Sequence, residues 1–258
     1  MRMTGYRPYP VPDGSFAGQT ILLTDGDDPV SRGLAAAFAA LGGDVFVAAE
    51  GETAVSAFDR FERPIDILVN CRWQRTLGPA EDMPPAQAQS EMHQLFGTAF
   101  DYSTEFARRR QRAQLGGSIL MLTETADLGM PGLSVSAAAS AAIQNLARSL
   151  AVEWAADNIR CNVVACGMIE GRDDPAFALA AQRGIAPGDT VPTGQIGTVA
   201  DVVAAALYLC SAYGAYFSGS TMTIDGGENL RHSLGGPPFS APRTRMLNRQ
   251  PREVRARQ

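Results

Sequence analysis

Short apolar runs alternate with longer segments of helical periodicity along most of this 258-residue chain. The apolar runs are four to six residues long, as buried strands are, and the longer segments repeat apolar side chains every three or four positions, as amphipathic helices do. The runs are residues 19–24, 44–48, 65–70, 119–122 and 159–164, and the helical segments are residues 30–41, 86–112, 136–154 and 199–211. A strand, a long helix and a second strand in this order form a parallel crossover unit. The pattern therefore predicts an α/β protein with a parallel sheet.

Composition changes at both ends of the chain and divides it into three parts. We expect an extended N-terminal arm at residues 1–17, a single domain at residues 18–235 and a tail rich in proline and arginine at residues 236–258. The last part of this tail, from residue 242, holds six arginines against Glu253, a local charge of +5 in a chain whose net charge is −5. We interpret the tail either as a solvated, disordered segment or as an arm that contacts an acidic subunit or an anionic ligand.

Bulk composition excludes several classes of function. With 45% hydrophobic residues the chain can bury a substantial core, and it contains no apolar run long enough for a membrane span. The first residues lack the apolar centre of a secretory leader, so we expect a cytoplasmic protein. The four cysteines lack paired metal-ligand spacing and there are only two histidines, so we expect reduced core cysteines and no metal site. The basic segments lack interleaved aromatic residues, and no nucleic-acid partner is expected.

Two segments of the domain are similar in sequence to a known protein family. Residues 218–227 read SGSTMTIDGG, and the characteristic residues of the segment 117–167 are Arg148, Ser149, Leu150, Ala151, Glu153, Ile159, Arg160, Asn162 and Gly167. This arrangement resembles the short-chain dehydrogenase/reductase family over about residues 18–230. The resemblance implies a Rossmann-like, doubly wound parallel sheet in three α/β/α layers within one domain.

The resemblance also assigns positions to the catalytic residues of that family, and none of them holds the family residue. Ser136 stands in place of the tyrosine and Ser140 in place of the lysine, while Glu124 replaces the serine and Gln94 the asparagine. A serine hydroxyl has too high a pKa to replace the tyrosine acid, and a carboxylate would repel a developing oxyanion. All 22 basic residues are arginines, so no lysine can tune an acid–base group. We therefore expect no catalytic residue for hydride transfer.

The turn that binds a dinucleotide pyrophosphate in the family is altered in the same way. Glycines are needed there because the backbone must turn tightly and approach the phosphates. Asp25, Pro29 and Ser31 occupy the three glycine positions, and Pro29 also removes an N–H donor. We interpret Asp27 or Asp28 as the N-cap of the following helix. The sequence therefore predicts that this chain binds no dinucleotide cofactor.

Three further positions affect the same prediction. The acidic residue that binds the adenosine ribose in the family falls on Ala49, and we expect the neighbouring Glu50 to be a solvated loop residue. Residues 71–73 read Cys-Arg-Trp, and Trp73 is expected to fill the volume of a cofactor or to serve an interface. The helix of residues 86–112 ends in a basic turn, which is either a solvated helix end or a contact for a phosphate of CoA or for a partner.

The leading functional hypothesis is a non-catalytic subunit that stabilises an active short-chain dehydrogenase. Some members of the family pair a competent subunit with a degenerate one, as in the two-subunit hydroxyacyl-CoA dehydrogenases of benzylsuccinate breakdown. By this analogy the assembly would be a heterotetramer, with NAD and an acyl-CoA substrate bound by the partner subunit.

Two other functions stay open at this stage. One is an isomerase, hydratase or lyase that needs no nicotinamide and uses Glu124 or Asp127 as a general base. The other is a homo-oligomeric regulator that binds a small ligand. An intact homologous subunit in the same complex would favour the leading hypothesis over both.

Overall fold

The computed structural model describes residues 9–72, 77–125, 132–172, 177, 181, 184 and 186–230. Three of the positions considered above lie outside these ranges: Trp73, Asp127 and the tail of residues 236–258. None of the helices within the described ranges is long and apolar enough to cross a bilayer.

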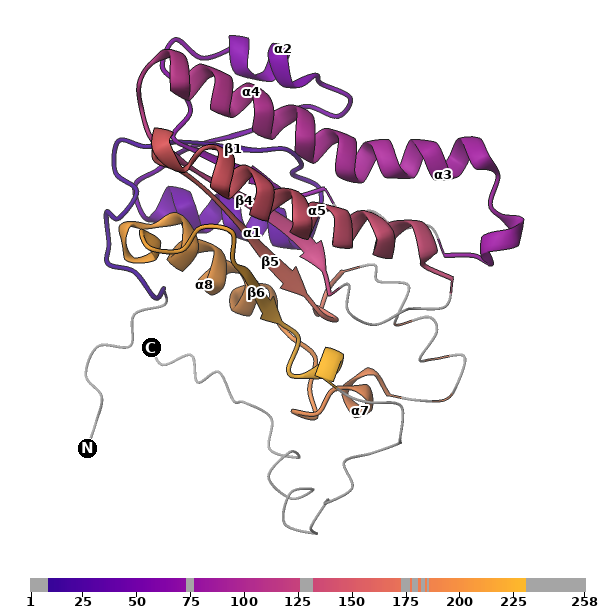
Figure 1. Cartoon of the computed structure of the whole chain (residues 1–258). Helices are drawn as coiled ribbons and strands as arrows, with labels where there is room; N and C mark the ends of the chain where they lie inside the picture. The colour runs from indigo at the N-terminus through magenta and orange to yellow at the C-terminus, as the bar shows by residue number, and fades with distance from the viewer. Residues whose placement is uncertain are drawn as a thin grey trace, which may run out of the picture.

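Six parallel strands form one sheet in the order β2-β1-β3-β4-β5-β6 (Figure 1). Their bounds are Thr20–Leu23 for β1, Asp44–Val47 for β2, Ile67–Asn70 for β3, Gly117–Glu124 for β4, Ile159–Cys166 for β5 and Thr221–Ile224 for β6. The central strands β1, β3, β4 and β5 are almost wholly buried, which explains why each reads as a continuous apolar run. The predicted Rossmann-like doubly wound sheet is confirmed.

Helices cover both faces of the sheet and complete the three layers (Figure 1). One face packs against α1 (Pro29–Ala40) and α8 (Val199–Cys210), and the other against α2 (Ala54–Asp59), α4 (Thr98–Arg112) and α5 (Ser134–Glu153). The remaining helical segments are short: η1 (Ala80–Asp82), α3 (Pro85–Met92), η2 (His93–Gly97), η3 (Ala155–Asp157), α7 (Pro187–Thr190), η4 (Ala212–Gly214) and η5 (Glu228–Leu230).

The helix predicted at residues 86–112 is interrupted by a π-helical turn. Segment η2, at His93–Gly97, separates α3 from α4 although the three follow one another along one path (Figure 1). At the end of this turn Gly97 lies against the ring of His93, since a Cβ atom there would lie 2.5 Å from Nδ1 of His93 unless that ring moved. A π turn adds one residue to the helical repeat and rotates the side chains that follow.

The basic end of α4 is partly structural and partly exposed. Arg110 is buried, and its guanidinium bonds Oδ1 of Asp66 at 2.9 Å and the main-chain oxygen of Gly116 at 2.6 Å. These bonds fasten the end of α4 to the segments that lead into β3 and β4. Arg112 is exposed and remains available to other partners.

Among the described residues, the sheet has no outer strand of the usual doubly wound order. That order, 3-2-1-4-5-6, places a third strand beyond the second. Here residues 48–66 connect β2 to β3 through the single short helix α2, which leaves no length for another strand and helix. Strand β2 is therefore the edge of the sheet, and its Phe46 is 42% exposed.

Candidate functional site

The candidate site lies at the carboxyl ends of β1 and β3, where the strand order reverses. Open α/β sheets bind ligands in the crevice at this switch point. The hydroxyl of Thr24 accepts the main-chain N–H of Cys71 at 3.0 Å and so joins the two strand ends. Burial raises the pKa of the Cys71 thiol far above its usual range, and the carboxylates of Asp25 and Asp28 raise it further. This thiol therefore stays protonated and is unsuited to nucleophilic chemistry.

Side chains fill the small space between the ends of β1 and β3 and the π-helical turn. Arg72, Leu95 and Met121 lie beside Thr24 and Asn70, and the space between them leaves no room for a water molecule. The amide of Asn70 donates to the hydroxyl of Ser103 on α4 at 3.1 Å, so it is held by the neighbouring helix. The bulk predicted for residues 71–73 is thus seen at Arg72, the described member that lines this gap.

In the turn between β1 and α1, main-chain amides donate hydrogen bonds to the carboxylates of the turn itself. Asp25 accepts the N–H of Asp27 at 3.0 Å, and Asp28 accepts the N–H of Val30 at 2.8 Å. Asp28 is the N-cap of α1 and Pro29 is its first residue, as the sequence indicated. Ser31 replaces the last glycine of the family turn and is fully buried. Two amide donors of this turn are therefore occupied by its own carboxylates, Pro29 offers no amide donor, and the turn carries three aspartates.

An ion pair joins this turn to the segment that follows β5. Nε of Arg172 lies 2.7 Å from Oδ2 of Asp28, and only 6% of the Arg172 side chain is exposed. The two residues are 144 positions apart in the sequence. The contact lies at the N-terminus of α1, on one side of the crevice. There the positive charge of Arg172 compensates the negative charge of Asp28. Sequence reasoning missed Arg172, and no local motif marks it.

The residue that bonds the end of β2 is Glu52, and not Glu50, which was considered from the sequence. The carboxylate of Glu52 accepts the N–H of Ala49 at 2.8 Å and lies 3.4 Å from Nε of Arg60. Its main-chain oxygen accepts the Tyr102 hydroxyl at 2.9 Å, and burial raises the pKa of Tyr102 to about 12. Glu50 is exposed, as predicted for a loop residue. Bonds within the chain, made by Glu52, therefore occupy the position at which the family binds the adenosine ribose.

The positions assigned to catalytic residues lie at the end of β4, on α5 and in the π-helical turn. Glu124 ends β4, Ser136 and Ser140 lie on α5, and all three are buried. The Ser136 hydroxyl donates to the main-chain oxygen of Leu133 at 3.2 Å, which is a bond within the helix start. Gln94 is exposed in the π-helical turn and donates to the hydroxyl of Ser90 at 3.4 Å. Helix α5 lies beside the end of β4, because the side-chain amide of Gln144 donates to the main-chain oxygen of Glu124 at 3.4 Å.

The residues at this site do not fit a nicotinamide dinucleotide. A pyrophosphate needs free amide donors and tolerates few negative charges, whereas this turn offers bonded amides and three aspartates. The family's hydride transfer needs an acid–base group at the tyrosine position, and the buried serines at the tyrosine and lysine positions do not supply one. Within the described ranges there is also no group of three or more histidine, cysteine, aspartate or glutamate residues that could hold a metal.

Known proteins share both the sequence and the fold of this chain. A family model described as enoyl-(acyl carrier protein) reductase matches residues 17–229. The peroxisomal 2,4-dienoyl-CoA reductase of Arabidopsis thaliana is 32% identical over 212 residues, which cover 78% of this chain and 71% of the relative. An oxidoreductase of Caenorhabditis elegans is 26% identical and covers 86% of this chain and 83% of its own length.

Solved structures agree with these relatives. A short chain dehydrogenase from Bacillus anthracis is 27% identical, has a TM-score of 0.74 and covers 84% of this chain and 98% of its own. A gluconate 5-dehydrogenase from Burkholderia cenocepacia, solved with NADP and tartrate, is 22% identical with a TM-score of 0.74, and it shares the fold over 85% of this chain and 99% of its own. The matched length, the sheet and the retained motifs together show that this chain belongs to the short-chain dehydrogenase/reductase family.

Proposed function

We propose that this chain is a non-catalytic member of its family that binds no nicotinamide cofactor. In this proposal it assembles with an active short-chain dehydrogenase and stabilises it. The partner binds NAD, and a hydroxyacyl-CoA is the class of substrate that the sequence analogy suggests. The relatives named above are reductases and dehydrogenases. In this proposal the partner subunit performs that chemistry, and this chain has a structural role.

The proposal is supported most directly by the turn between β1 and α1, where carboxylates of this chain bond the amides at the position of the family's pyrophosphate. The carboxylate of Asp25 accepts the N–H of Asp27 in the turn, that of Asp28 accepts the N–H of Val30 in the first turn of α1, and Arg172 pairs with Asp28. A dinucleotide would have to displace these bonds and approach three carboxylates at close range. Two like charges about 4 Å apart repel by about 1 kcal/mol in water and by about 4 kcal/mol near a protein surface. Cofactor binding at this turn is therefore strongly disfavoured.

The surface supports assembly with another subunit. Phe100 on α4 is 42% exposed and stacks on Phe96, and Val152 near the end of α5 is 80% exposed. A second group of exposed apolar side chains, Tyr213, Tyr216 and Leu230, flanks β6. These exposed side chains lie on α4 and α5 and on either side of the final strand. The family resemblance implies dimer and tetramer contacts at α5 and the final strand, so we assign the subunit contacts to these surfaces.

Binding of NADH and NADPH to the purified chain, measured by isothermal titration calorimetry, tests the cofactor part of the proposal. We expect no saturable binding of either dinucleotide up to about 1 mM, which corresponds to a binding free energy weaker than about −4 kcal/mol. The same titration of an intact short-chain dehydrogenase is the positive control. Saturable binding of either dinucleotide in the micromolar range would overturn the proposal.

A further inference from the structure

The open edge of the sheet at β2 carries main-chain groups that point away from the rest of the sheet. Within the described ranges, β1 is the only strand that pairs with β2. The N–H of Ala48, directly after β2, donates to the main-chain oxygen of Leu23 in β1 at 2.8 Å. Successive residues of a strand direct these groups to opposite sides, so the N–H and C=O groups of Val45 and Val47 point outwards.

One of these four outward groups is already bonded. The main-chain oxygen of Val47 accepts Nη2 of Arg60 at 3.2 Å, and its second lone pair is left for another donor. The other three groups, which are both groups of Val45 and the N–H of Val47, have no hydrogen-bond partner among the described residues. A row of such groups is a template for the addition of another strand.

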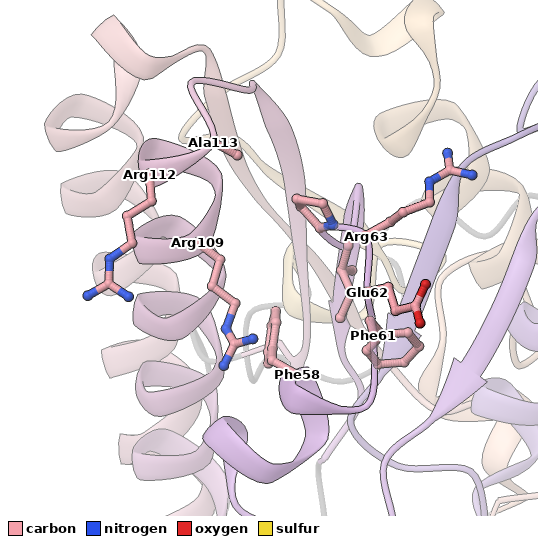
Figure 2. Close-up of a pocket in the computed structure, with 9 residues that line it drawn as sticks. Phe58, Phe61, Glu62, Arg63, Arg109, Arg112 and Ala113 are labelled. Carbon is pink, nitrogen blue, oxygen red and sulfur yellow. The ribbon is translucent and has the colours of Figure 1, made fainter.

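The side chains along β2 place an aromatic ring between two opposite charges. Phe46 is 42% exposed, and its ring meets that of Phe61 edge-on with the centroids 4.7 Å apart. Figure 2 shows Phe61 on the segment that follows α2. Asp44 is exposed at the amino end of the strand, and the exposed Arg60 bonds its carboxyl end at Val47. The outer edge of β2 therefore runs from a negative end through an apolar centre to a positive end.

We propose that β2 pairs with β2 of a second copy of this chain, antiparallel and around a two-fold axis at Phe46. Val45 of each copy then faces Val47 of the other, and the two residues exchange N–H···O=C bonds through their outward groups. The Phe46 side chains of the two copies lie directly opposite each other, at the closer spacing of a pair that exchanges no hydrogen bonds. The two sheets thus become one continuous sheet.

The charges of the strand favour a second copy as the partner and favour this direction. In the antiparallel pair Asp44 lies opposite Ala48 of the other copy, next to the Val47 to which Arg60 is bonded. The contact then contains two such pairs of opposite charge, one at each end. A parallel pair in register would instead place Asp44 beside Asp44, and like charges directly opposite each other destabilise a pair of strands. Because both copies present the same edge, the contact closes after two chains.

This contact goes beyond the proposed function and uses a different surface. The contact with an active dehydrogenase is assigned to α5 and β6, and β6 forms the opposite edge of the sheet from β2. Two chains that pair through β2 therefore leave the surfaces for the other subunit uncovered.

Disulfide formation between full-length chains tests the pairing and its register. The four cysteines of the chain are buried and should not compete. Phe46→Cys should link two copies under mild oxidation, because residues opposite each other at the axis bring their Cβ atoms within about 5 Å. Val45→Cys alone and Val47→Cys alone should link at least about tenfold more slowly, because each lies about 7 Å or more from its own equivalent. A mixture of these two variants should link, since Val45 faces Val47. Equal linking of all three single variants, or none with Phe46→Cys, would overturn the proposal.

Self-association of the full chain, followed by sedimentation velocity, tests the contact without a cross-link. Phe46→Lys places like charges opposite each other at the axis and should weaken the self-association at least about tenfold. Leu115→Lys is the matched control, because Leu115 is 43% exposed in the connection between α4 and β4, and it should leave the self-association unchanged. A wild-type chain that does not self-associate, or equal association of the two variants, would contradict the contact. Neither experiment contains a cofactor or a second protein, so the proposed function is tested separately.

Discussion

At the scale of single residues, the family motif survives where it holds the fold together. Arg160 donates to the main-chain oxygens of Leu209 at 2.8 Å and Gly214 at 3.0 Å. Asn162 donates to the main-chain oxygen of Phe217 at 2.8 Å and accepts the N–H of Ser220 at 3.1 Å. These bonds fasten β5 to the end of α8 and to β6. They need no cofactor, so their retention is compatible with the loss of the residues that perform the family's chemistry.

The part of the candidate site that could be predicted from the sequence consists of interactions between residues close together in the chain. An aspartate followed by proline at a helix start indicates an N-cap, and Asp28 is that cap. The partner of Asp28 could not be predicted, because Arg172 lies 144 positions away in a segment with no motif. In the same way Glu52, three residues beyond Ala49, binds its amide by a turn that the side-chain pattern does not reveal.

The ion pair between Asp28 and Arg172 should be strongly coupled because both side chains are largely buried. In a double-mutant cycle of Asp28→Asn and Arg172→Met, followed by urea denaturation, we expect a coupling free energy of about 1–3 kcal/mol. The asparagine keeps the cap and removes only the charge. Asp59 and Arg109 form the control pair, since Asp59 is 63% exposed and its coupling should be below about 1 kcal/mol. Equal coupling in the two cycles would contradict this account of the crevice.

At the scale of elements, hydrophobic periodicity located the strands and the long helices. The strand predicted at residues 119–122 extends in the structure to Gly117–Glu124, because pairing with β5 continues through the polar residues Thr123 and Glu124. Pairing is decided by the neighbouring strand, and the side-chain pattern of one strand does not contain it. The π-helical turn at His93–Gly97 was missed for a related reason, since its side chains also fit an α-helical repeat.

Close packing between η4 and α8 gives a prediction at this scale. A Cβ atom on Gly214 would lie 2.6 Å from the main-chain oxygen of Tyr208 and 2.7 Å from that of Leu209. Backbone atoms cannot rotate away as side chains do, so Gly214→Ala should lower the free energy of unfolding by about 1–3 kcal/mol. Gly78→Ala is the matched control, because nothing lies within 4 Å of its added Cβ. Thermal and urea denaturation measure both, and a loss no larger at Gly214 than at Gly78 would show that the helix end is loosely packed.

At the scale of the whole molecule, the chain keeps the family sheet but differs at its edge. The family resemblance predicted the doubly wound sheet correctly, and the comparisons with solved structures agree with it. The short connection of residues 48–66 leaves no length for a strand beyond β2, so this difference could have been predicted from the sequence. The family resemblance alone did not reveal it. Edge strands that present apolar side chains are exposed to association, and Phe46 and Val47 of β2 are such residues.

Native mass spectrometry of the untagged protein, purified from the cells that produce it, tests the central claim most directly. Our account predicts a hetero-oligomer in equal stoichiometry with an intact short-chain dehydrogenase, in which NAD binds to the other subunit. The partner's mass and sequence would then direct the search for the substrate. A homo-oligomer without a second protein, above all one that retains a nicotinamide dinucleotide, would contradict the account.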